Sequence, residues 1–353
     1  MKQGCCVGLL ILFFTLSPLC ITSPTEIPAK LLEESERTYN NRIGRLPSGV
    51  EIYLYPLLDP CSISPSAILT KKDGESLVVE QPLSRKGQIH LDEIERIPRN
   101  KKHELLYQLN LLYREEPGFV KALTLRGKIF LNMRAFQKAE SPLLKAIELN
   151  PIDFEAYTYL GGSYFNRDIL DGARTAYIKS ILYNPNNERG WRGLSRLGEK
   201  TGFTVQARKI RIGAWMVKVS ENEIDLFVDS ELRNPHTIGP WTSFITAKAA
   251  WVYEGIFQKR YPEAKSYYYT VAEDLYAYDF MLEYWQLIKS RKNVSDPDLD
   301  FLLEVKEKDL LPGYILFEEV GPICPETILV QPARMINKIQ AYIEEFVLRP
   351  DPG

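Results

Sequence analysis

The sequence predicts a mainly α-helical protein, in which a solenoid of helical hairpins lies between a small irregular and β N-terminal cap and a helical C-terminal region. Three observations support this fold class. Pro117, Pro151 and Pro185 are evenly spaced, and each follows a helical run. The 353-residue chain is 45% hydrophobic and 25% charged, as folded globular proteins are. After Ser220, several candidate helices begin near prolines, which favour the first helical turn.

The amino terminus has the features of a secretory signal peptide. Lys2 precedes an apolar run from Cys5 to Cys20, which is followed by the small and polar residues Thr22 and Ser23. The run has about 16 residues, whereas a membrane-spanning helix needs roughly 20. We therefore expect residues 1–22 to be removed and the chain to be exported, to the periplasm, the cell envelope or the medium, without stable membrane insertion. An uncleaved anchor is the alternative.

Two cysteines, Cys61 and Cys324, remain after such a cleavage. Both lie among prolines, where no helix imposes a direction on the side chain. Two thiols in an oxidising compartment favour one disulfide, which would join the start of the mature chain to its end. The alternative is two unrelated thiols.

Residues 23–100 are expected to form a cap in which loops dominate, with two or three strands. Ala29 to Tyr39 is a short amphipathic stretch, and Glu51 to Tyr55 is a candidate strand. Residues 67–70 and 75–80 flank the turn sequence Lys71 to Gly74, which is the pattern of a β-hairpin.

The repeats are expected within residues 101–220, as units at 117–150, 151–184 and 185–219. In the middle unit the regularly spaced residues are Tyr157, Leu160, Gly161, Tyr164, Ala173, Tyr177, Ser180 and Pro185. Small residues suit close crossings of antiparallel helices, and aromatic residues suit the space between successive pairs. The flanking units are less regular, since Pro142 should kink a helix of the first and the third has no closing proline. Leu105, Leu109 and Leu112 indicate a partial unit upstream.

This order of aromatic, Leu, Gly, Tyr, Ala, aromatic, small residue and Pro resembles the tetratricopeptide repeat family. The resemblance implies stacked helical hairpins that bury a continuous core only when several units are joined. It also implies a concave groove, lined by the first helix of each pair, that binds a protein or peptide client.

The resemblance assigns a set of groove residues. They are Lys121, Lys128, Asn132, Phe165, Asn166, Arg189, Arg192 and Arg196. Thr124 and Thr158 belong to the same helix faces. Five members of the set are basic although the chain has a net charge of −2, and arginine binds carboxylates in a bidentate manner. We therefore expect a groove for an acidic segment; the alternative is an ordinary solvated helix face.

Residues 221–353 are expected to be helical and are rich in aromatic side chains. Tyr267, Tyr268 and Tyr269 are consecutive, so on a helix at least one of them should be accessible. An enzyme or carbohydrate-binding site in this region, near the loop residue His236, is the alternative function.

Other function classes find little support in the sequence. The near-neutral charge gives no general attraction to nucleic acid. No pattern typical of a catalytic nucleophile with its base, a metal site or a phosphate-binding loop is present, so we expect no catalytic residue, metal or cofactor. The leading hypothesis is a non-enzymatic scaffold or assembly factor; a structural spacer without a client is a further alternative.

Overall fold

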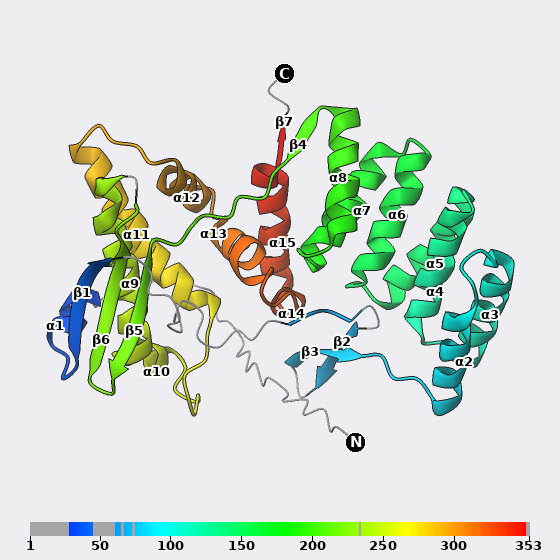
Figure 1. Cartoon of the computed structure of the whole chain (residues 1–353), viewed down its shortest axis with the longest axis horizontal. Coiled ribbons are helices and arrows are strands. Elements are labelled where there is room, and N and C mark those ends of the chain that lie inside the picture. The colour runs from blue at the N-terminus through cyan, green and yellow to red at the C-terminus, as the bar shows by residue number, and fades with distance from the viewer. Residues whose placement is uncertain (1–27, 45–60, 65–66, 73–74, 233, 351–353) are drawn as a thin grey trace.

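The computed structural model describes residues 28–44, 61–64, 67–72, 75–232 and 234–350. The protein is mainly helical, as predicted. Figure 1 shows a row of helices on one side, a small sheet with two long helices on the other, and further helices between them. The predicted signal peptide and the predicted strand from Glu51 to Tyr55 lie outside the described residues.

The row of helices, here called the helical array, contains α2 (Arg85–Arg96), α3 (Lys102–Glu115), α4 (Val120–Asn132), α5 (Phe136–Leu149), α6 (Phe154–Asn166), α7 (Leu170–Tyr183) and α8 (Glu188–Thr201). The starts of α4, α6 and α8 have the same spacing as the three prolines, and so do the starts of α3, α5 and α7. Each helix packs on the next along the chain, and α6 also contacts α4 and α8 (Figure 1).

Small residues bring the helices of the array close together. A Cβ atom on Gly127 would lie 2.4 Å from the Leu143 side chain, and one on Gly161, one period later, would lie 2.7 Å from the Tyr177 ring. The α4–α5 and α6–α7 turns contain Arg134 and Asp168, one period apart, and both have a φ of 57°. The sequence period is therefore present in the helices, their crossings and their turns.

The array differs from the prediction at both ends. The segment 23–100 was expected to contain loops and two or three strands. It also contains α2, which forms about one period before α4 and is capped by Ser84, whose hydroxyl accepts a hydrogen bond from Gly87 N. The expected second helix of the unit at 185–219 does not form. After Gly202, at φ 80°, the chain enters the strands β4 (Phe203–Val205) and β5 (Ala214–Ser220). Within the first unit, α5 runs through Pro142.

A three-stranded sheet joins the predicted cap to segments that were expected to be helical, since the first strand of the sheet lies within residues 23–100 and the other two strands lie after residue 213. Its strand order is β1 (Thr38–Gly44), β6 (Glu223–Asp229) and β5, with β1 parallel and β5 antiparallel to β6. The strand β4 pairs antiparallel with β7 (Leu348–Pro350). The strands near both ends of the described chain, β1 and β7, thus pair with strands from its middle.

The other helices form the second side of the molecule and the part between. They are α1 (Pro28–Glu33), η1 (Pro235–Thr237), α9 (Ile238–Tyr253), α10 (Ile256–Arg260), α11 (Val271–Arg291), α12 (Pro297–Glu307), α13 (Leu311–Tyr314), η2 (Ile315–Val320), α14 (Glu326–Leu329), α15 (Ala333–Tyr342) and η3 (Ile343–Val347). Large aromatic side chains, among them Trp251, Tyr278 and Trp285, are buried here. Much of the aromatic content of this region therefore serves the core.

The three consecutive tyrosines were expected on one helix, but they lie outside it. They precede α11 in an irregular segment, and each is half-buried. The Tyr267 and Tyr269 hydroxyls bond to carboxylates of α11, and the Tyr268 ring packs edge-on against Phe257 at 5.0 Å.

The predicted β-hairpin forms from β2 (Ala67–Lys72) and β3 (Glu75–Glu80), which pair antiparallel. Ahead of it, Cys61 lies at disulfide distance from Cys324, with 4.6 Å between their Cα atoms, as predicted. The backbone also joins there, since Cys61 N donates to Ile323 O at 3.1 Å. In the described part of the chain, no helix is both long and apolar enough to span a membrane.

Candidate functional site

Basic and aromatic side chains share one face of α4, α6 and α8. We call this surface the groove face; its residues are Lys121, Lys128, Glu155, Tyr159, Phe165, Arg189, Arg192, Arg196 and Lys200. On α8, the basic residues are spaced by three or four positions, so they line one side of the helix. Arg189, Arg192 and Arg196 are exposed, whereas Lys121, Lys128 and Phe165 are half-buried.

Tyr159 joins the three helices at one end of the groove face. Its ring centre lies 5.7 Å from the Lys128 ammonium of α4, and its hydroxyl accepts a hydrogen bond from Arg189 of α8 at 3.1 Å. Arg189 also lies 3.7 Å from the carboxylate of Glu155. Burial raises the pKa of the Tyr159 hydroxyl, so it stays neutral. The prediction did not include Tyr159, whose position resembles an ordinary core tyrosine.

Phe165 provides a second meeting point. Its ring centre lies 5.3 Å from the Arg196 guanidinium and 5.5 Å from the Lys200 ammonium. Lys200 is also paired with Asp168. Cation–π contacts of this kind hold a guanidinium over a ring while leaving its donors available.

The structure brings together Lys128, Phe165, Arg189 and Arg196 of the predicted set through these contacts. The two predicted asparagines are exposed at the ends of their helices. The Asn166 amide donates to Gly162 O at 2.7 Å within α6, and Asn132 O accepts a hydrogen bond from Lys102 of α3 at 2.7 Å.

Thr124 and Thr158 were expected on the groove face, but both are buried between units. The Thr124 hydroxyl donates to the Asp153 carboxylate at 2.6 Å, and one period later the Asn187 amide donates to the Thr158 hydroxyl at 2.8 Å. A buried hydroxyl needs a partner, and here the residue before the next unit's first helix supplies it. These contacts fix how successive units pack.

Asp153 carries an ionisable group into this buried contact. Burial raises its pKa to about 6, although hydrogen bonds from Thr124 and from Ala156 N oppose the shift. Because the folded-state pKa exceeds the usual value of 3.8, the protonated form is favoured by folding. The stability that protonated Asp153 gives to the folded state is fully present below about pH 4 and is lost as the pH rises through about 6.

Asp153→Asn should remove this pH dependence, because the amide keeps an acceptor for Ala156 N and carries no charge. The equivalent residue one period later, Asn187, already is an asparagine. Between about pH 4 and 7, the free energy of unfolding of the variant should rise relative to wild type by about 2 to 3 kcal/mol. Urea unfolding across this range measures the difference, and a difference that is constant with pH would contradict the assignment.

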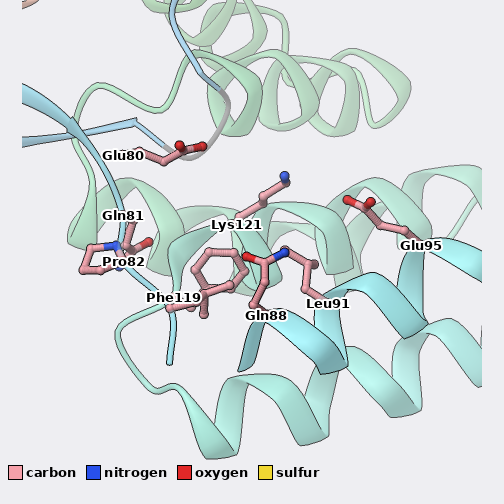
Figure 2. Close-up of a pocket in the computed structure, with 9 residues that line it drawn as sticks. Glu80, Gln81, Pro82, Gln88, Leu91, Glu95, Phe119 and Lys121 are labelled. Carbon is pink, nitrogen blue, oxygen red and sulfur yellow. The ribbon is translucent and has the colours of Figure 1, made fainter. Parts of the chain in front are cut away.

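A hollow of about 380 Å³ opens at the α2 end of the groove face. Its walls are Glu80, Gln81, Pro82, Leu83, Gln88, Leu91, Glu95, Phe119 and Lys121 (Figure 2). Gln81 is held in place, since its side chain accepts a hydrogen bond from Val120 N at 2.9 Å and donates to Gly118 O. The prediction missed this hollow because it did not include α2.

A buried ion cluster lies in the aromatic C-terminal region. The Lys248 ammonium is 2.6 Å from carboxylate oxygens of both Glu273 and Asp274, and the three side chains are at most 1% exposed. The hydroxyls of Tyr267 and Tyr269 donate hydrogen bonds to the two carboxylates. Burial raises the pKa of Glu273, and both carboxylates raise that of Lys248 against the opposing effect of burial. These polar groups thus meet in the interior.

His236, the other residue of the alternative site, lies in η1. Its backbone N donates to the Asn234 side chain at 3.0 Å, as part of the cap that begins this helix. A scan of the chain against protein-family models found no match, and a comparison with curated protein sequences found no similar protein.

Proposed function

We propose that this protein is a non-enzymatic scaffold or assembly factor that binds an acidic segment of a protein client along the groove face, which acts as the groove of a tetratricopeptide-like array. The observation that carries the proposal is the row of exposed arginines on α8, beside the aromatic residues Tyr159 and Phe165 of α6. Arginine donors are suited to carboxylates, and the half-buried Phe165 ring beside them gives contact area to the client.

The arrangement of the arginines supports binding rather than internal pairing. Arg196 is exposed and lies over Phe165, a ring that leaves its guanidinium edges toward solvent. Arg189 is also exposed, and its contact to Glu155 is as long as 3.7 Å. An exposed contact of this kind is worth about 0 to 1 kcal/mol, so a client carboxylate can compete with it.

The alternative, an enzyme or carbohydrate-binding site in the C-terminal region, has weaker support. Its large rings fill the core, and its convergent polar groups, Lys248, Glu273 and Asp274, are enclosed. A substrate site needs polar groups that line an open cavity. We also propose export of the chain, which the expected signal peptide and the pairing of Cys61 with Cys324 favour.

Reversing two arginine charges tests the proposal. The probe is a fluorescein-labelled peptide of glutamates alternating with glycines, and its affinity is measured by fluorescence anisotropy at about 0.1 M salt. Arg192→Glu with Arg196→Glu should weaken binding at least tenfold, because two attractions become repulsions.

The matched control is Arg99→Glu with Lys138→Glu, two exposed residues off the groove face that give the same change in net charge. It should retain affinity within about twofold, since distant exposed charges are screened. An equal loss of affinity in both variants would mean that the peptide binds only through general charge attraction. Wild-type protein that does not bind the probe would contradict an acidic client.

A further inference from the structure

The groove face and the hollow beside it carry opposite charge at their two ends. At the α8 end, Arg189, Arg192 and Arg196 are exposed. At the α2 end, the carboxylates of Glu80 and Glu95 flank the hollow, with Lys121 between them (Figure 2). A client lying along α4, α6 and α8 therefore meets an acidic pocket at one end and a basic surface at the other.

The hollow is suited to one long side chain. Leu91 and Phe119, which are 5% and 3% exposed, supply its apolar surface. The amide groups of Gln81 and Gln88 supply neutral polar walls, and the volume of about 380 Å³ exceeds what one side chain requires. Lysine and arginine combine an aliphatic stem, which can pack on the apolar surface of Leu91 and Phe119, with a charged end that stays near solvent.

The charge of the hollow selects the sign of the occupant. Two carboxylates and one ammonium line it, so one further positive charge brings its total to neutral. An acidic side chain placed there would add a third carboxylate beside Glu80 and Glu95. The hollow therefore favours a basic side chain, the opposite of what the α8 end favours.

The spacing between the two ends sets the length of the client segment. Packed helix axes lie about 8 to 10 Å apart, and two such steps lead from α4 through α6 to α8, which gives about 16 to 20 Å. An extended chain covers about 3.3 Å per residue, so about five to six residues connect the two ends.

We propose that the client is an extended segment of opposite charges, whose lysine or arginine enters the hollow of Glu80 and Glu95 while acidic residues about six positions away bind Arg192 and Arg196. This inference rests on the proposed function and adds the position and charge of a second anchor. The acidic hollow also orients the segment along the face, because the reversed segment would place like charges together at both ends.

The test uses labelled peptides and the full chain. The first peptide has one lysine, five alternating glycine and serine residues and three glutamates. A second has the same composition in reverse order, because an extended segment can lie along the face in either chain direction. In a matching pair, glutamine replaces the lysine. The better-bound lysine peptide should exceed its glutamine partner about fivefold in affinity, as expected for one partly exposed charge pair.

The protein variant Glu95→Gln should abolish that fivefold difference and leave binding of the glutamine peptide unchanged. The control Glu93→Gln changes an exposed residue of the same helix outside the hollow and should preserve the difference. Equal affinities for lysine and glutamine peptides in wild type would overturn the second anchor while the groove proposal stands. If neither peptide binds wild type, both proposals fail.

Discussion

Lys248→Met is expected to lower the free energy of unfolding by about 3 to 5 kcal/mol, because it leaves two buried carboxylates without their counter-charge. Glu273 and Asp274 each lie 2.6 Å from the Lys248 ammonium, and the burial of all three side chains keeps out water that could replace it. The hydroxyls of Tyr267 and Tyr269 remain as donors, but they carry no positive charge. Urea unfolding followed by circular dichroism and by tryptophan fluorescence measures the change.

Two comparisons show whether the loss comes from unpaired charge. Lys289→Met removes a partly exposed partner of Asp300 and should cost less than about 1 kcal/mol. Adding Glu273→Gln and Asp274→Asn to Lys248→Met should recover part of the stability, since the buried groups are then neutral. A triple variant less stable than Lys248→Met alone would mean that packing, rather than charge, accounts for the effect.

Loss of the bond between Cys61 and Cys324 is the second large effect. The two residues are separated by 263 positions, and closing so long a loop stabilises the folded state by about 5 to 6 kcal/mol in the chain-entropy description. Cys61→Ser with Cys324→Ser should therefore lower the free energy of unfolding by about that amount, and should release the segment before β2 from the segment before α14.

Reduction of the wild-type protein provides the control for this variant. Dithiothreitol should bring the wild-type unfolding curve onto that of the double variant and leave the variant's own curve unchanged. Wild-type stability that does not respond to reductant, in protein whose thiols are shown to be reduced, would argue against a stabilising bond.

The sequence was informative wherever the fold repeats itself. The evenly spaced prolines mark the ends of helices, and Gly127 and Gly161 mark their crossings, because only a missing side chain permits such close approach. Both are local signals that a pattern in the sequence carries directly. The sequence of α2 also carries local signals, a capping serine at Ser84 and the apolar positions Leu91 and Ile94 on one face, but the prediction assigned residues 23–100 to the cap and missed that helix.

Partners that are distant in the chain account for the elements that were predicted wrongly. The segment after α8 becomes β4 because it pairs with β7 at the end of the described chain, and β1 near its beginning pairs with β6. Thr124 and Thr158 were expected on the groove because their helix positions allow it. Only the packing of the next unit, with its Asp153 or Asn187, brings them inside.

The parallel pairing of β1 with β6 also bears on the order in which the molecule assembles. Helices α2 to α8 contact near neighbours along the chain, so this part can form quickly and early. The ladder of β1 with β6 cannot form until Thr38 meets Glu223, and the ladder of β4 with β7 cannot form until Phe203 meets Pro350. During synthesis, β1 therefore stays without its partner until most of the polypeptide has emerged, and the completion of these two sheets is the slow, late event of folding.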